Sequence, residues 1–154
     1  MVKSIFWNAQ RVLGSDFLRY FKLMVKVQQP NIVAVVEPHI SGIKVDNFIR
    51  FSGFDSSYRV EATCFSGGIW VLWKSTVRFD ALAVSSQFVH RWVSDLLERK
   101  SFAITFVYAS PNGSKRTSLW DQLRDLTPGY GMAWTIGGDF NAIASTSERR
   151  GGSR

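Results

Sequence analysis

Short apolar segments lead directly into Asn8 and Glu37, and another leads through two glycines into Asp139, which Asn141 follows two residues later. In layered α/β proteins, ligands tend to bind beyond the carboxyl ends of strands, where side chains distant in sequence can meet. Carboxylate and amide oxygens without thiolates suit a hard cation, and Mg²⁺ is preferred because it binds few carboxylates and keeps waters. Such a cation could polarise a phosphoryl oxygen and stabilise charge on a leaving oxygen. Taken alone, Asn8, Glu37 or Asp139 is better explained as a turn former, because Asn and Asp often follow strands, and only their combination favours a cation site.

The elements that must position these residues alternate between short strands and amphipathic helices. A helix is predicted over Phe17–Val27, with its basic residues, Lys26 among them, on one face and its apolar residues on the other. A second helix is predicted to begin with Ser114 as N-cap and to stop at Pro128-Gly129. The predicted strands are 2–7, 32–36 and 133–136, together with a mostly meandering set between residues 48 and 108: Ile69–Trp73, Val77–Val84, Gln87–Ser94 and Phe102–Tyr108.

Size, charge and cysteine content narrow the function classes. The 154 residues allow one domain or part of one, and 19 Lys and Arg against 12 Asp and Glu give a net charge of +7, which favours nucleic acid among partners. A single cysteine, Cys64, cannot form an internal disulfide or, with two histidines, a Cys/His zinc site. No signal peptide is recognised, and the longest aliphatic run, Ile32–Val36, is far shorter than the about 20 residues that cross a bilayer. We therefore expect an intracellular protein, nuclear or cytoplasmic, without a membrane span.

Several short motifs occur in an order that resembles the endonuclease/exonuclease/phosphatase (DNase I-like) superfamily. Within it, the sequence is most similar to the apurinic-type endonuclease domain of plant LINE-like, non-LTR retrotransposons. The motifs are Trp7-Asn8, Pro30 through Glu37, Ser66-Gly67-Gly68-Ile69-Trp70-Val71, Val107-Tyr108-Ala109-Ser110-Pro111, Gly138-Asp139-Phe140-Asn141 and Glu148-Arg149-Arg150-Gly151-Gly152. The Gly-Asp-Phe-Asn tetrad and the final motif are the most specific of these.

The resemblance implies an α/β fold, a four-layer αββα sandwich, that hydrolyses phosphodiesters with Mg²⁺, or with Mn²⁺ in its place. It implies that Glu37 is the principal metal ligand and Asn8 the metal-site asparagine. Asp139 would orient the attacking water or protonate the leaving group, Asn141 would steady the phosphate, and Tyr108 would contact it. For Tyr108, an aromatic residue packed within a sheet is an equal alternative.

Two basic residues and a glycine pair leave alternatives open. Arg149 and Arg150 could bind the DNA backbone, and a solvated basic loop explains them at least as well. A hairpin turn is preferred over a phosphate cradle for Ser66-Gly67-Gly68, because no helix pattern follows it.

Family members also carry a C-terminal Asp/Asn region and a closing Ser-Asp-His, and neither precedes Arg154 in this sequence. Neither His39 nor His90 takes the place of that histidine. We therefore expect residues 1–154 to form a partial domain with an incomplete second sheet, inactive in isolation, from a retroelement that nicks target DNA and carries a reverse transcriptase. The alternatives are a non-catalytic remnant that binds nucleic acid or protein, and a phosphoesterase of the same superfamily that acts on a small phosphoester.

Overall fold

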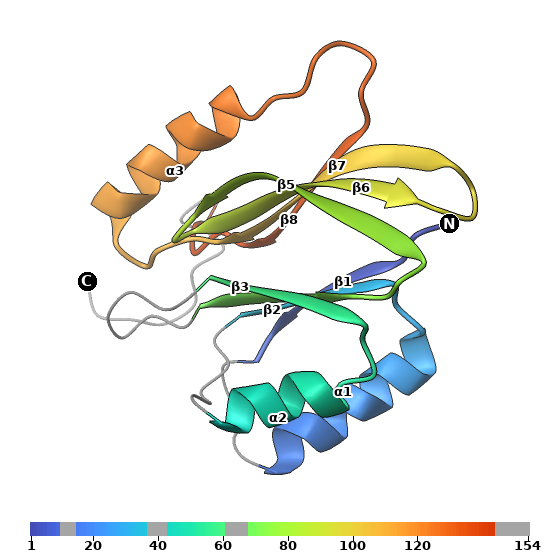
Figure 1. Ribbon diagram of the computed structural model, residues 1–154. Coiled ribbons are helices and arrows are strands. Elements are labelled where there is room, and N and C mark those ends of the chain that lie inside the picture. Colours follow the sequence, from blue (N-terminus) through green and yellow to red (C-terminus); the bar gives the residue numbers. More distant parts are fainter. Residues whose placement is uncertain (10–14, 37–42, 61–67, 144–154) are drawn as a thin grey trace.

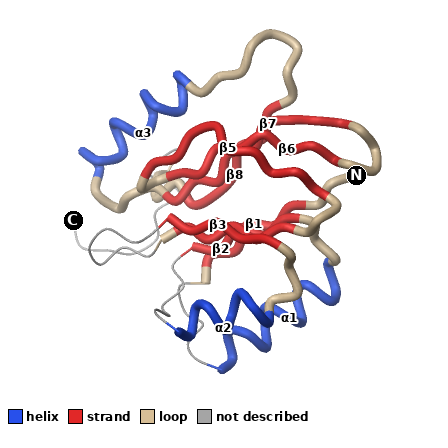
Figure 2. Tube along the Cα trace, viewed as in Figure 1, coloured by secondary structure: helices blue, strands red, loops and turns tan. Residues whose placement is uncertain are grey.

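The computed structural model describes residues 1–9, 15–36, 43–60 and 68–143 of the chain. Two β-sheets lie face to face, with helices α1 (Ser15–Gln28) and α2 (Ile43–Phe51) on the outer face of the first sheet and α3 (Gly113–Asp125) on the outer face of the second (Figures 1 and 2). The expected α/β class and the four-layer αββα sandwich are confirmed. No helix in the described ranges is long and apolar enough to cross a membrane.

The first sheet has four strands in the order β1-β2-β4-β3. Their bounds are β1 (Ser4–Asn8), β2 (Ile32–Val36), β4 (Ile69–Trp73) and β3 (Ser56–Val60). β1 runs parallel to β2, and β4 runs antiparallel to both of its neighbours. All five residues of β2 are buried, because a central strand between helices and a second sheet has no solvent-facing side.

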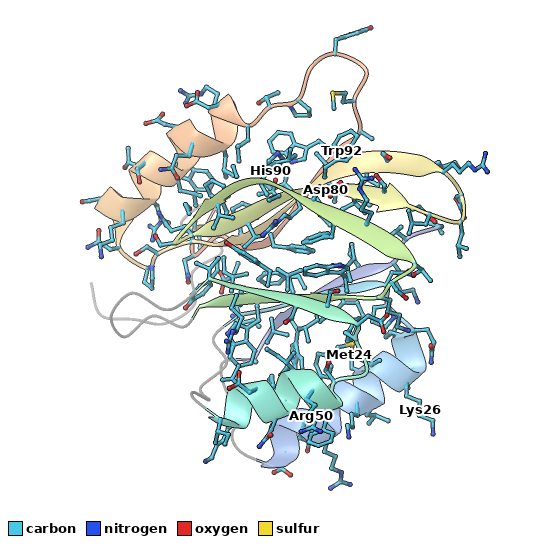
Figure 3. The ribbon with its side chains drawn as sticks, viewed as in Figure 1. Met24, Lys26, Arg50, Asp80, His90 and Trp92 are labelled. Atoms are coloured by element: carbon cyan, nitrogen blue, oxygen red, sulfur yellow. The ribbon has the colours of Figure 1, made fainter. Side chains whose placement is uncertain are left out.

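Aromatic side chains join the two helices to this sheet. Phe17 and Phe21 are four residues apart on α1 and therefore share one face. Both rings lie 4.8 Å from the ring of Phe48 on α2. Lys26 points away from the sheet (Figure 3), as predicted for the basic face of the first helix, and Arg50 on α2 does the same.

The second sheet also has four strands among the described residues, in the order β5-β6-β7-β8. Their bounds are β5 (Val77–Ser85), β6 (Phe88–Asp95), β7 (Lys100–Tyr108) and β8 (Trp134–Asp139). The first three form the expected antiparallel meander, and β8 joins parallel to β7. The segment Ile69–Trp73 was wrongly grouped with this meander, because it pairs with β2 and β3 in the other sheet.

Two elements, α2 and β3, were missing from the sequence-based prediction. α2 shows only a short apolar pattern, with Val45 and Phe48 buried, and lies where β-rich sequence was expected to begin. β3 is half-exposed at the edge of its sheet, so that its sequence lacks the apolar run that identifies β2. It pairs antiparallel with β4. The hairpin turn predicted at Ser66-Gly67-Gly68 stays a prediction, because Ser66 and Gly67 lie outside the described residues.

The N-cap of α3 is Asn112 and not Ser114. The Asn112 side chain accepts hydrogen bonds from the backbone N–H groups of Ser114 and Lys115, at 2.9 and 3.3 Å. Both residues are good caps, and Asn112 is selected because its backbone is extended while residues from Gly113 onward are helical. The helix ends at Asp125, before the predicted Pro128-Gly129 stop.

Candidate functional site

The carboxyl ends of β1 and β8 meet at one end of the sandwich. Asn8 is the last residue of β1, and Asp139 is the last residue of β8 in the other sheet. The Asn8 Nδ2 donates a hydrogen bond to the Asp139 Oδ2 over 3.0 Å, although the two residues are 131 positions apart in sequence. The tertiary structure therefore brings together two of the side chains that the sequence predicted to converge.

The glycine before Asp139 lets β8 approach its neighbour closely. Gly138 has a φ of +152°, and a Cβ added there would lie 1.9 Å from the backbone oxygen of Val107. Strand β8 consequently runs through both glycines to Asp139, beyond the predicted end at residue 136. In this register Asp139 lies opposite Tyr108, and the Ala109 N–H donates to the Asp139 backbone oxygen at 2.8 Å.

Hydrogen bonds orient both oxygens of the Asp139 carboxylate. The Oδ1 accepts from the backbone N–H of Asn141 at 2.9 Å, and the Oδ2 accepts from Asn8. The first bond closes a local turn in which Asn141 adopts a φ of +43°, a conformation that Asn tolerates better than most residues. A half-buried carboxylate with two fixed donors is held in one orientation and keeps lone pairs for a further ligand or proton.

Asn141 ties this turn to the end of β7. Its Nδ2 donates to the Ala109 backbone oxygen at 2.7 Å, so that the amide nitrogen is engaged with the main chain. These hydrogen bonds give Asn141 a local structural role beside Asp139. Its predicted contact with a phosphate stays a prediction.

Tyr108 on β7 is paired with Asp139 on β8 in the strand register, and it is buried in the core. Its side chain is 4% exposed and belongs to the apolar cluster between the two sheets. This placement matches the alternative interpretation of an aromatic residue packed within a sheet. A contact between Tyr108 and a substrate phosphate remains a prediction.

Three predicted site residues, Glu37, Arg149 and Arg150, lie outside the described residues. The described strand before Glu37 ends at Val36, which is in register with Asn8 and accepts a hydrogen bond from the Ala9 N–H at 3.0 Å. The carboxyl ends of β1, β2 and β8 thus lie at the same end of the sandwich.

Sequence reasoning missed Gln87, which braces the segment between β7 and α3. Its Oε1 accepts from the Ser110 N–H at 2.7 Å, and its Nε2 donates to the Lys115 oxygen at 3.0 Å. Its backbone oxygen accepts from the Tyr108 N–H at 2.8 Å. A lone glutamine in a turn carries no sequence signal for such a role.

The donors at this end of the sandwich fit a hard cation. Asp139 offers a carboxylate and Asn8 an amide, and both oxygen types are ligands that Mg²⁺ accepts. Within the described ranges, no three His, Cys, Asp or Glu side chains gather closely enough to hold a metal by themselves. By themselves, the described residues at this end of the sandwich do not complete a cation site.

No family model and no curated protein matches the sequence. Solved structures do match. AP endonuclease LMAP from Leishmania major matches with a TM-score of 0.67 at 14% identity. The match covers 99% of this chain and 59% of the LMAP chain. The endonuclease domain of TRAS1, a telomere-specific non-LTR retrotransposon, has a TM-score of 0.61 at 13% identity and covers 91% and 61%. D. rerio TDP2, complexed with a single-strand DNA product, has a TM-score of 0.64 at 14% identity and covers 91% and 60%.

At these identities the likeness concerns the fold. The chain spans about three fifths of the length of these structures. With its two face-to-face mixed sheets and flanking helices, it shares the DNase I-like fold of these structures.

Proposed function

We propose that the chain is the N-terminal portion of a divalent-metal-dependent phosphodiesterase, a retroelement endonuclease that nicks DNA. The observation that carries the proposal is the hydrogen bond from Asn8 to Asp139, which joins two strand ends from different sheets at an oxygen-rich site. A purely structural role for these residues would not require that the two strands end on the same point.

Asp139 is the residue proposed to handle the proton or orient the attacking water. Its two hydrogen-bond donors fix the carboxylate, so that it can receive or deliver a proton at a defined position. Asn8 and, by the resemblance, Glu37 would hold Mg²⁺ or Mn²⁺. A bound divalent cation would supply polarisation of the phosphoryl oxygen and stabilisation of the leaving oxygen.

DNA is the proposed substrate in preference to a small phosphoester. The net charge of +7 favours a long polyanion, and a retrotransposon endonuclease domain is among the structures with this fold. Arg149 and Arg150 are proposed to contact backbone phosphates, and Tyr108 and Asn141 to contact the scissile phosphate. Association with a reverse transcriptase in one polyprotein, and a nuclear or cytoplasmic location, belong to the same proposal.

Plasmid nicking tests the proposal. We expect residues 1–154 alone to show no Mg²⁺-dependent nicking. A longer chain that adds a C-terminal segment with the superfamily's Ser-Asp-His is expected to convert supercoiled plasmid to open circles. In the extended chain, Asp139→Asn and Glu37→Gln are expected to reduce nicking at least 10²-fold, the usual minimum for losing acid–base assistance. Asp16→Asn is the matched control. It removes an exposed carboxylate from α1, the helix layer outside the first sheet, and should nick normally.

Full nicking by Asp139→Asn would reject the site assignment. Robust nicking by residues 1–154 would reject the partial-domain proposal. The second candidate, a binding remnant, predicts salt-sensitive DNA binding with no cleavage by any form of the chain.

A further inference from the structure

One aromatic side chain on α3 stays accessible beside the candidate site. Leu119 and Leu123 are buried against the second sheet, whereas Trp120 between them is 41% exposed. The Trp120 indole stacks on the ring of Phe140, with ring centres 5.9 Å apart and planes 11° from parallel. Phe140 is the residue after Asp139, so that the exposed indole lies one side chain away from the site.

Two arginines flank Trp120 at helical spacing. Arg116 and Arg124 are four residues before and after it, which places all three side chains on one face of α3. We call Arg116, Trp120 and Arg124 the α3 stripe. At a rise of about 1.5 Å per residue, the stripe extends over roughly 12 Å.

Arg116 is anchored by the protein, Arg124 makes one exposed ion pair, and both keep donors for a ligand. The Arg116 Nη1 donates to the backbone oxygens of Ser110 and Pro111 at 2.9 and 2.7 Å, which anchors it where β7 leads into α3. The Arg124 Nη1 is 3.2 Å from Asp121 Oδ1, and the Arg124 side chain is 76% exposed. A guanidinium has five N–H donors, so that each arginine retains N–H groups beyond these contacts.

The α3 stripe begins at the end of the sandwich that carries Asp139. α3 starts five residues after the end of β7, and the Ala109 N–H between them donates to the Asp139 backbone oxygen. Figure 1 shows α3 lying over the outer face of the second sheet, and the Trp120–Phe140 stack joins α3 to the residue that follows β8. A strand bound at the site could therefore continue along α3.

We propose that the α3 stripe binds single-stranded DNA, with an unpaired base stacked on Trp120 and backbone phosphates on Arg116 and Arg124. Alternating aromatic and basic side chains are the combination that recognises single strands, because bases stack on rings while cations take the phosphates. A duplex does not fit this arrangement, since its base faces are already stacked. The inference rests on the proposed function, because it makes the strand at the α3 stripe a continuation of the strand at Asp139.

The test is binding of two labelled strands in the absence of divalent metal, measured by fluorescence anisotropy. One probe is a twelve-nucleotide oligothymidylate, and the other is a strand of abasic deoxyribose phosphates with equal length and charge. The wild-type chain should bind the thymidylate from about fivefold to more than 100-fold more tightly, the range expected for stacking one base on an aromatic ring. Trp120→Ala should bind both probes equally, whereas Trp120→Phe should keep part of the preference.

Controls separate stacking from folding and from charge. Tyr130→Ala, which removes a fully exposed aromatic residue from the loop after α3, should keep the full preference. Arg124→Gln should lower the slope of log affinity against log salt by about 0.7, the value for one phosphate contact on a single strand, without changing the base preference. Circular dichroism of each variant shows whether it is folded.

An unchanged preference in Trp120→Ala, or no preference in the wild type, would overturn the inference. Binding of a duplex with the same dependence on Trp120 would overturn it as well. Because no metal is present, these outcomes do not depend on cleavage. Normal nicking by Asp139→Asn would instead reject the proposed function and leave the base preference at Trp120 intact.

Discussion

The outer faces of the two sheets are covered to different extents. On the first sheet, Phe17 and Phe21 of α1 and Phe48 of α2 are at most 3% exposed, because both helices turn these rings toward the sheet. On the second, α3 buries two leucines, leaves Trp120 accessible, and has beside its C-terminal end a cavity of about 430 Å³ lined in part by His90. The first face chiefly provides stability, and the accessible aromatic surface lies on the face next to the candidate site.

The largest effect is expected at Gly138, where β8 lies close against β7 just before Asp139. Gly138→Ala places a Cβ 1.9 Å from the Val107 backbone oxygen, so that β8 must separate from β7. We expect a loss of about 4 kcal/mol or more in the free energy of unfolding, measured by urea denaturation. Gly137→Ala is the matched control, because nothing lies within 4 Å of its added Cβ. Equal effects at both positions would show that close strand approach is not what Gly138 provides.

Core truncation on the two faces tests the comparison directly. Phe21→Ala should lower the free energy of unfolding by about 3–5 kcal/mol, because the ring is fully buried against Phe48. Leu123→Ala under α3 should cost about 2–3 kcal/mol, since a smaller and 7% exposed side chain is removed. Leu23→Ala, 57% exposed on α1, is the control and should change stability little. A larger loss for Leu123→Ala than for Phe21→Ala would reverse the comparison.

A smaller effect is expected at the start of α3. Asn112→Ala removes the acceptor for two backbone N–H groups and should cost about 1 kcal/mol in thermal or urea unfolding. Ser114→Ala should change the free energy of unfolding by no more than about 0.5 kcal/mol. Ser114 contributes its backbone N–H to the cap, and alanine keeps that group. The reverse order would restore Ser114 as the N-cap predicted from sequence.

The smallest effect is a pH dependence within the second sheet. Burial lowers the pKa of His90, whose Nδ1 lies 2.7 Å from the Thr105 Oγ1. The unfolded chain therefore binds a proton at a higher pH than the folded chain does, so stability is retained above about pH 6.5 and declines as the pH falls below that value. His90→Gln should flatten this part of the stability–pH curve. A curve that keeps its full slope in His90→Gln would assign the titration to another group.

Much of the fold could be predicted from the sequence, because local patterns of apolar and polar residues indicate most of its strands and helices. β2 was predicted with its observed bounds, since a continuous branched apolar run ended by proline and polar residues has few other interpretations. α2 was missed because its nine residues bury only two side chains, too few to establish a helical period. The assignment of β4 to the meander failed for a different reason. Strand pattern shows that a strand exists and does not show which sheet it joins.

The candidate site could be predicted in part. The sequence predicts Asn8 and Asp139 as oxygen ligands at strand ends, and the structure places the Asn8 Nδ2 3.0 Å from the Asp139 Oδ2. Tyr108 followed only from a motif, and the core position that it occupies depends on the packing of two sheets against each other. The Phe140–Trp120 stack could not be foreseen, because the contact needs the end of β8 and the middle of α3 to lie side by side.

The sequence by itself determined most of the segments that become strands and helices, α2 and β3 excepted, and which polar side chains stand at strand ends, because propensity and periodicity act over a few neighbouring residues. Only the tertiary structure decided that the ends of β1 and β8 meet and that Trp120 stays accessible above Phe140. Those outcomes depend on the sandwich packing of two separate sheets, and contacts across 131 residues leave no periodic signature in the chain.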